Sequence, residues 1–240
     1  MTSRFLPTLL DEASRPFRNG GHFAYHYARG KLSSDCIFRE LLKRGVFPAE
    51  ARFLDLGCGQ GSLFGWLLAA RRLHDNGHWP NDWAPPPKPL ELRGYELMHK
   101  DVERAARAFG RDHPVVSIRQ GDMCQVDFGQ TDVVTILDAL HYIDFAHQKD
   151  VIKRIRAALP AGGLFLTRVG DAGGGLRYHI CNWVDHAVTF TRGHRLPKLY
   201  CRKVAEWCEL LRSVGFQVET MPMSAGKPFA NIMLICRVPS

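Results

Sequence analysis

The sequence predicts an α/β fold: a three-layer, doubly wound sheet that is mostly parallel and has an antiparallel last strand. Three observations support this prediction. Short apolar runs alternate with segments of helical periodicity along most of the chain. A glycine-rich turn, GCGQG (57–61), follows the first apolar run. The last two apolar runs are joined by a turn (224–230) that is too short for a crossover helix, so they are expected to pair antiparallel.

Each strand is expected where a short apolar segment ends at glycine or at a polar residue. Strands that alternate with helices form a parallel sheet covered on both faces. The expected order in the sheet is 3-2-1-4-5-7-6. In chain order the strand segments are 51–57, 90–97, 115–123, the start of 131–143, 163–170, 216–223 and 231–238.

Helices are expected where apolar residues recur every three or four positions. Glycine or proline marks the end of several of them, as Gly110 does after the helix at 101–110. The helical segments are 34–47, 62–73, 101–110, 148–163 and 201–216. The segment 74–89 carries five prolines, which predicts an extended surface loop with a structural role.

The whole chain, 1–240, is expected to be a single domain. An N-terminal helical lid segment (1–50) precedes the core (51–170). The segment 171–199 interrupts the link between the fifth strand and its helix, and it is interpreted as an insertion on the substrate side. A helix and a strand hairpin form the last part, 200–240.

Composition limits the class of protein. The chain has seven cysteines, an odd number, and no C-x-x-C pair. This argues against a disulfide framework and a zinc site, and it favours a reducing cytoplasm. The sequence contains no run of about 18 apolar residues, so no membrane helix is expected. The N-terminus lacks the continuous apolar stretch of a secretory signal.

The net charge of +8 favours an anionic partner. Bases exceed acids between Asp171 and Lys203. This excess indicates either a solvated basic face or a docking surface for an acidic partner. Aromatic and basic residues do not interleave as in an RNA-recognition signature, so nucleic acid is not favoured.

The glycine-rich turn does not match a motif for nucleotide phosphates. Gly57, Gly59 and Gly61 form G-x-G-x-G, and Ser62 stands where the dinucleotide motif has its third glycine. No G-K-[ST] follows, so a Walker phosphate cradle is excluded. For these glycines alone, a tight turn without a ligand stays an alternative.

Three motifs together resemble those of the class I S-adenosylmethionine-dependent methyltransferases, which have a Rossmann-like fold. They are DLGCGQG (55–61), Glu96 at the end of the second strand, and GDM (121–123) at the end of the third. The resemblance covers about residues 50–170 and implies that this core binds S-adenosylmethionine. The cofactor-binding residues that it implies are Tyr27, Arg29, Asp55, Gly57, Cys58, Gly59, Gly61, Glu96, Leu97, Gly121, Asp122, Met123, Asp138 and Ala139.

These residues have different expected roles. The glycines let the backbone approach the methionine part of the cofactor, where a side chain would collide. Asp55 holds the amino group through water, and Glu96 accepts hydrogen bonds from both ribose hydroxyls. By resemblance, Asp122 faces the adenine amino group, Met123 packs on the ring, and Asp138 lies near the methionine part.

The charge of the expected ligand crevice, at the carboxyl ends of the strands, indicates the kind of ligand. It is expected to have carboxylates at four successive strand ends and no basic cradle. Such a site suits a sulfonium cation and repels a pyrophosphate. The four carboxylates are Asp55, Glu96, Asp122 and Asp138.

The segment GGHFAYHYARGKLSSD (20–35) resembles the lid of this class. Tyr25, Tyr27 and Arg29 are the candidates for closing over the cofactor, with Arg29 pairing with its carboxylate. The alternative is a packing segment with a surface arginine.

Two histidines are candidates for the general base. His141 follows Asp138 at the mouth of the crevice, and His179 lies in the inserted segment. A positioned base that removes the proton of a phenol or carboxylic acid contributes about 10²–10⁴-fold. Trp183 and Phe190 are candidate walls for an aromatic acceptor. For each of these residues, packing is the alternative role.

Missing motifs narrow the acceptor. The fourth strand does not end in N/D-P-P-Y, which argues against amino-group methylation of adenine or glutamine. No Pro-Cys follows it, so cytosine C5 chemistry lacks its nucleophile. A metal-dependent catechol site would need acids after the fourth and fifth strands followed by an asparagine. Asp138 and Asp171 roughly fit, but Ala172 follows Asp171, so no metal site is expected. The remaining hypothesis is O- or C-methylation of a phenolic or carboxylic small molecule.

The whole-chain pattern also resembles the methyltransferases of bacterial aryl polyene pigment pathways. Their intermediates are bound to acidic acyl carrier proteins, which would dock on the basic segment 171–203. Two other functions stay open. One is an RNA methyltransferase, which the net charge motivates; the other is a non-catalytic cofactor-binding scaffold in a biosynthetic complex.

Overall fold

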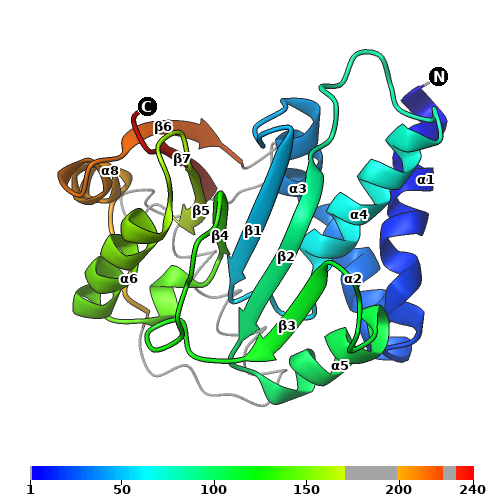
Figure 1. Cartoon of the computed structure of the whole chain (residues 1–240), viewed down its shortest axis with the longest axis horizontal. Helices are drawn as coiled ribbons and strands as arrows, with labels where there is room; N and C mark the ends of the chain where they lie inside the picture. The colour runs from blue at the N-terminus through cyan, green and yellow to red at the C-terminus, as the bar shows by residue number, and fades with distance from the viewer. Residues whose placement is uncertain (1, 171–198, 224–230) are drawn as a thin grey trace. The chain divides into compact units, whose positions relative to one another are not determined.

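The computed structural model describes residues 2–170, 199–223 and 231–240. The seven strands of this described part form one sheet in the order β3-β2-β1-β4-β5-β7-β6, which confirms the predicted fold class (Figure 1). β1, β2 and β3 pair in parallel, and β7 pairs antiparallel with both β5 and β6. The strands are β1 (Glu50–Leu56), β2 (Lys88–Glu96), β3 (Val116–Gln120), β4 (Val133–Leu137), β5 (Leu164–Gly170), β6 (Gln217–Pro222) and β7 (Asn231–Arg237).

The chain divides into two compact units. The first unit comprises residues up to 127 together with 131–133, and the second comprises 128–130 and 134–240. The helices of the first unit are α1 (Thr2–Ser14), the 3-10 turn η1 (Arg15–Arg18), α2 (His22–Ser34), α3 (Cys36–Lys43), α4 (Ser62–Asp75) and α5 (His99–Phe109). Those described in the second unit are η2 (Leu140–Tyr142), α6 (Phe145–Ala158) and α8 (Val204–Ser213).

In the first unit, the strand register brings three strand ends together. Leu56, the last residue of β1, lies beside Tyr95 of β2. Glu96, the last residue of β2, lies beside Gln120 at the end of β3. Because the strands are parallel, the residues that follow all three meet at one edge of the sheet, where ligands bind in folds of this kind.

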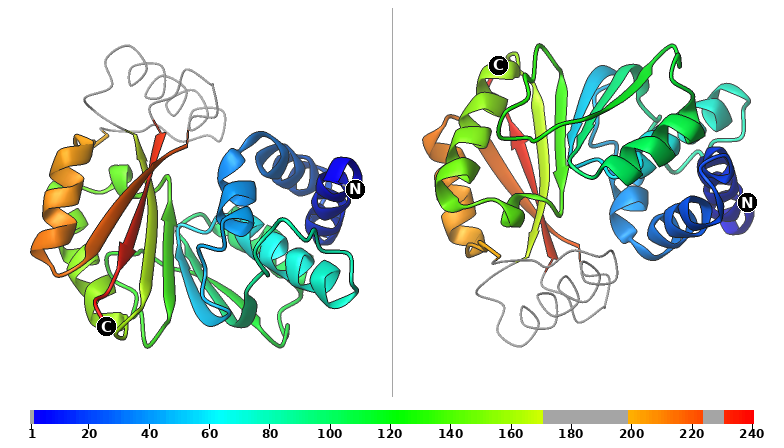
Figure 2. Two further views of the ribbon diagram at one scale, coloured as in Figure 1. Left: turned by 90° about the horizontal axis from the view of Figure 1, so that it is seen from above. Right: turned by 90° about the horizontal axis from the view of Figure 1, so that it is seen from below.

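The N-terminal helices α1 and α2 lie beside α4 in both views of Figure 2. Leu9 and Ala13 of α1 and Phe17 of η1 are fully buried. A Cβ atom added to Gly65 of α4 would lie 2.8 Å from the carbonyl oxygen of Ala13, so the two helices approach each other closely at this glycine. The N-terminal segment, predicted to be helical but delimited only for the helix at 34–47, is therefore part of the packed core.

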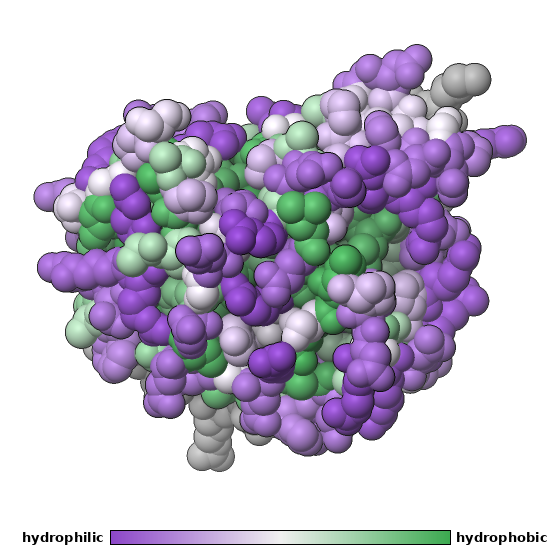
Figure 3. Space-filling model, viewed as in Figure 1, coloured by the Kyte–Doolittle hydropathy of each residue, from purple (hydrophilic) through white to green (hydrophobic). Residues whose placement is uncertain are grey.

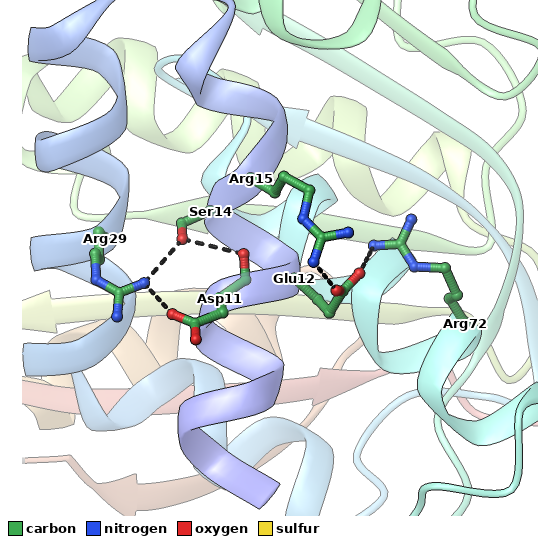
Figure 4. Close-up of polar contacts among 6 residues, drawn as sticks. All are labelled: Asp11, Glu12, Ser14, Arg15, Arg29 and Arg72. Atoms are coloured by element: carbon green, nitrogen blue, oxygen red, sulfur yellow. Dashed lines mark hydrogen bonds and ion pairs between the residues drawn. The ribbon is translucent and has the colours of Figure 1, made fainter.

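Ion pairs hold α1 between its two neighbours (Figure 4). Glu12 is bonded by Arg15 of η1 and by Arg72 of α4, the latter at 2.8 Å. Asp11, one residue earlier, is bonded by Arg29 of α2. The two adjacent acids thus tie α1 to α2 on one side and to α4 on the other.

The loop between α4 and β2 packs against α1. The ring of Phe5 contacts Trp79 and Trp83 edge-on, with centroid distances of 5.1 and 5.3 Å. Trp83 is buried, and the indole N–H of Trp79 donates to the carbonyl oxygen of Ala84 at 2.9 Å. The proline-rich loop was predicted to lie on the surface, but its two tryptophans fix it to the N-terminal helix.

In the second unit, α6 and α8 lie on the same side of the strands in both views of Figure 2. Ile155 of α6 and Trp207 and Leu211 of α8 are buried. α6 begins earlier than predicted because Asp144 caps it: its carboxylate accepts a hydrogen bond from the backbone N–H of His147 at 2.9 Å.

No helix among the described residues is long and apolar enough to cross a membrane. The described part of the chain also contains no group of three or more histidine, cysteine or acidic side chains that could hold a metal ion. The six cysteines within it form no disulfide bond with one another.

Candidate cofactor site and catalytic turn

The glycine-rich turn after β1 has an unusual backbone. Gly57, Gly59 and Gly61 have φ angles of 76°, 57° and 84°, a region that residues with a Cβ atom rarely adopt. The N–H groups of Gly57 and Cys58 both donate to the carbonyl oxygen of Tyr95, at 2.8 and 3.2 Å. The turn is thereby fixed to the end of β2.

Two of these glycines differ in what surrounds them. A Cβ atom added to Gly61 would lie 2.7 Å from Ile118 and 2.9 Å from Phe109, so packing also requires this glycine. A Cβ atom added to Gly59 would meet no atom within 4 Å. The backbone at Gly59 therefore faces open space, which fits a ligand that approaches the main chain closely.

The carboxylate of Glu96 joins the glycine turn to the start of α5. Oε2 accepts from the backbone N–H of Gly59 at 2.8 Å, and Oε1 accepts from the N–H of Met98 at 2.9 Å. A carboxylate oxygen can accept more than one hydrogen bond, so both can also receive the hydroxyls of a ligand. The sequence predicted Glu96 in this site but not its contact with Gly59.

Asp55 and Cys58 lie beneath the turn. Both are buried, and a Cβ atom on Gly94 would lie 2.6 Å from the Cys58 sulfur. Burial, followed by the negative charges of Asp55 and Glu96, raises the pKa of the Cys58 thiol well above its ordinary value. This cysteine therefore stays protonated and serves packing.

The end of β3 lies against the end of β2. The N–H of Gly121 donates to the backbone carbonyl of Glu96 at 3.0 Å. Asp122 shapes the following turn: Oδ1 accepts from the N–H of Cys124 at 2.8 Å. Leu97 is 62% exposed and Met123 is half-buried, so these two apolar residues of the predicted cofactor site are accessible to a ligand.

Among the residues that the structure describes, few large hydrophobic side chains are exposed at the surface. Figure 3 shows one face, on which hydrophobic residues lie between hydrophilic ones. Those most exposed in the described part are Phe23, Leu90, Leu97, Tyr142 and Phe145.

The predicted closing residues of α2 are held by other side chains. Arg29 bonds Asp11 and also donates to the hydroxyl of Ser14 at 3.3 Å (Figure 4). A hydrogen bond from Arg18 lowers the pKa of Tyr25, and Tyr27 stacks on Phe23. The guanidinium of Arg29 thus already has partners within the protein. Its pairing with a cofactor carboxylate stays a prediction.

Gln60 connects the glycine turn to α2, and the sequence analysis missed it. Its side chain is 1% exposed, and Nε2 donates to the carbonyl oxygen of Ala24 at 2.8 Å. In the sequence this residue was one of the variable positions between glycines, so nothing marked it as a contact to a segment 36 residues away.

Asp138, at the end of β4 in the second unit, has φ 61° and is the one non-glycine residue with positive φ in the described part. Arg168 of β5 bonds both of its carboxylate oxygens, with Nε donating to Oδ1 at 2.6 Å. The predicted site had acids without a basic partner. Arg168 corrects this for Asp138, whose negative charge is balanced within its own unit.

His141 lies in η2, half-buried, with its ring 4.2 Å from that of Tyr142. Burial lowers its pKa, and the charge of Asp138 opposes this shift. Ala139, between them, is buried. The other candidates, His179, Trp183 and Phe190, lie outside the described residues, as do Asp171 and Ala172.

Known proteins match this chain in sequence and in fold. A family model described as a methyltransferase domain matches residues 54–165. A curated carboxy-S-adenosyl-L-methionine synthase from Chromohalobacter salexigens is 29% identical over 118 residues, which are 48% of this chain and 38% of that protein. The chain thus spans less than half the length of this relative.

Solved structures share the fold. In the complex between the Trm112 methyltransferase activator and a methyltransferase from Haloferax volcanii, one chain has a TM-score of 0.64 and 17% identity, covering 92% of this chain and 98% of that one. Human N-acetylserotonin methyltransferase with S-adenosylmethionine has a TM-score of 0.58 and 14% identity, covering 89% of this chain and 54% of that one. Magnesium protoporphyrin IX methyltransferase from Synechocystis, with S-adenosylhomocysteine bound, has a TM-score of 0.57 and 16% identity, covering 90% of this chain and 88% of that one.

Proposed function

We propose that this protein methylates a small molecule carrying a phenol or a carboxylic acid, on oxygen or carbon. The premise is that residues 54–165 place the chain among the class I S-adenosylmethionine-dependent methyltransferases. The observation that carries the cofactor part of this proposal is the pairing of Gly59 with Glu96. Open space above Gly59 admits the cofactor, and the carboxylate that fixes this glycine is a hydrogen-bond acceptor for ribose hydroxyls.

The residues of the first unit fit the proposed cofactor. S-adenosylmethionine supplies, when bound, an electrophilic methyl group on a sulfonium cation. Asp55 and Glu96 are acids at the ends of neighbouring strands, which suits a cationic ligand. Asp122 and Met123 would hold the adenine, and Gly57, Gly59 and Gly61 keep side chains away from the methionine part.

His141 is the proposed general base for the acceptor. Its lowered pKa leaves the imidazole neutral near pH 7, and a neutral imidazole can accept a proton from a phenol or a carboxylic acid. Asp138 stabilises the imidazolium that results, since its charge favours the protonated ring. His179 is the second candidate for this role.

An acidic acyl carrier protein is the proposed partner if the acceptor is carrier-bound. The net charge of +8 and the exposed Lys203 support this. Arg202 does not add to the argument, because its guanidinium is engaged with Gln148 and Phe145. A docking site would depend on the other bases of 171–203.

The test is to identify the ligand and then the product. Mass spectrometry of the purified protein should detect S-adenosylmethionine or S-adenosylhomocysteine. Carboxylated S-adenosylmethionine would instead indicate chemistry nearer to that named for the Chromohalobacter relative. Labelled methyl groups should then enter a member of a panel of phenols and carboxylic acids. Calorimetric binding of NAD or ATP with no binding of S-adenosylhomocysteine would overturn the proposal.

A further inference from the structure

One buried glutamine of the second unit connects two separate stretches of backbone. Gln148 of α6 is fully buried. Its Nε2 atom lies within hydrogen-bond distance of three carbonyl oxygens: Leu140 at 3.1 Å, Ile143 at 3.1 Å and Tyr200 at 2.8 Å. An amide has two N–H groups, so at least one of these bonds is shared.

The other end of the same amide is also occupied. Oε1 of Gln148 accepts from Nε of Arg202 at 2.9 Å. The Arg202 guanidinium lies 4.4 Å from the ring centroid of Phe145 and 5.5 Å from that of Trp207, which fixes its orientation. The donor end of the amide therefore has one direction only, toward the three carbonyls.

The turn that these bonds hold is the one that carries His141. Leu140 precedes this histidine, and Ile143 follows it by two residues. The carbonyl oxygen of His141 itself accepts from the backbone N–H of Tyr200 at 2.9 Å. The histidine backbone is thus fixed on both sides by Gln148 and directly by a residue that Gln148 also binds.

We propose that Gln148 is a positioning residue that holds His141 in place for proton transfer. It touches neither cofactor nor acceptor in this role; it acts through the backbone of the turn and through Tyr200. This inference rests on the proposed function of His141 as a base. It adds a residue that no motif marks, since a glutamine in an amphipathic helix is ordinarily a surface residue.

Two substitutions separate the donor end of the amide from its acceptor end. Gln148→Met removes both ends while keeping an unbranched side chain of similar length. Gln148→Glu keeps an acceptor for Arg202 but has no N–H for the three carbonyls. Ile155→Val, at a fully buried position two turns along α6, is the matched control that perturbs packing without altering these bonds.

Hydrogen exchange at the Tyr200 amide is the first readout, because this N–H bonds the carbonyl of His141. In both Gln148 variants the exchange should become at least about tenfold faster, as the turn opens locally. The ring signal of His141 in NMR, assigned with His141→Asn, should shift or broaden. Ile155→Val should leave both signals as in the unmodified protein.

Turnover is the second readout. A misplacement of about 1 Å can cost on the order of 10²-fold in rate, so kcat should fall by about 10- to 100-fold in the Gln148 variants. KM for S-adenosylmethionine should change by less than about twofold, because the loss concerns a step after binding. If Gln148→Met does not fold, Gln148→Glu and Arg202→Met carry the test.

The outcomes distinguish this inference from the proposed function. Unchanged Tyr200 exchange and an unchanged His141 signal in a folded Gln148 variant would overturn the inference. So would a changed turn with unaltered kcat in an active enzyme. If the unmodified protein methylates no acceptor, the proposed function fails, while exchange and NMR still decide whether Gln148 holds the turn.

Discussion

The guanidinium of Arg168 bonds both carboxylate oxygens of Asp138, whose φ of 61° is the one positive value among the non-glycine residues that the structure describes. Nε of Arg168 lies 2.6 Å from Oδ1. The arginine side chain is 7% exposed and the aspartate side chain 34%. Aspartate tolerates positive φ better than most residues, and the ion pair holds it there. The pair therefore sets where the chain leaves β4 and enters the turn with His141.

Replacing the arginine should show how much this ion pair contributes to the free energy of unfolding. Breaking a fully buried pair costs about 3–5 kcal/mol; because a third of Asp138 is exposed, Arg168→Met should lower the free energy of unfolding by roughly 1–3 kcal/mol. Urea denaturation measures this loss. Arg52→Met, which breaks a more exposed bidentate pair with Asp132, is the control and should cost less. Equal losses in the two variants would contradict a special role for Asp138.

The two glycines of the turn should respond differently to alanine. Both need positive φ, which costs an L-residue about 1–2 kcal/mol. Gly61→Ala also forces a methyl group against Ile118 and Phe109, so overpacking should add about 1–3 kcal/mol to its loss of stability. Gly59→Ala meets no protein atom and should instead weaken S-adenosylhomocysteine binding by more than about tenfold, or 1.4 kcal/mol. Thermal unfolding and calorimetry together measure both effects, and an unaltered affinity in Gly59→Ala would remove the ligand from this position.

Loss of the Glu96 carboxylate should weaken cofactor binding. Hydrogen bonds to charged groups contribute about 1.5–3 kcal/mol, and Glu96→Ala should reduce the affinity for S-adenosylhomocysteine by about that amount in calorimetry. Part of the loss will come from Gly59, whose N–H also loses its acceptor. Glu91→Gln, in the same strand, should bind as the unmodified protein does. Tight binding by Glu96→Ala would argue against the whole site.

The pH dependence of turnover should follow the pKa of His141. Burial lowers this pKa below the usual histidine value of about 6.5, so the base stays neutral at pH 6.5 and becomes protonated only when the pH falls below the lowered pKa. The rate should therefore decline only at acidic pH. Asp138 raises the pKa against the effect of burial, so Asp138→Asn should move the acidic limb to still lower pH. kcat/KM measured across pH gives the limb, and His141→Asn should abolish it.

The same shift has a consequence for stability. The folded pKa of His141 is lower than the unfolded one, so the unfolded chain binds the proton more readily. The unfavourable contribution begins as the pH falls below the unfolded pKa and is complete below the folded pKa. His141→Asn should remove this part of the acid destabilisation in urea titrations at several pH values.

What could be predicted from the sequence depends on how far apart in the chain the interacting residues lie. The parallel and antiparallel directions of the strands followed from alternation and from the short last connection, both of which are local patterns, and the strand order agreed with the family resemblance. The bounds of α1 within the helical N-terminal segment were not predicted, because Pro7 lies inside this helix and a proline normally argues against one. The glycines and Glu96 were found because a motif joins them. Arg168 and Gln148 were missed because their partners lie 30 and 52 residues away in the chain, at Asp138 and Tyr200.

The docking of α1 onto α4 also bears on how the protein is made. A ribosome releases the N-terminal helix well before residues 62–75 are synthesised, so Leu9 and Ala13 have no surface to cover them during that interval. Glu12 likewise waits for Arg72. The nascent chain must carry the apolar face of this amphipathic helix unburied until about sixty further residues have emerged, so aggregation or chaperone binding is most expected in the early part of translation.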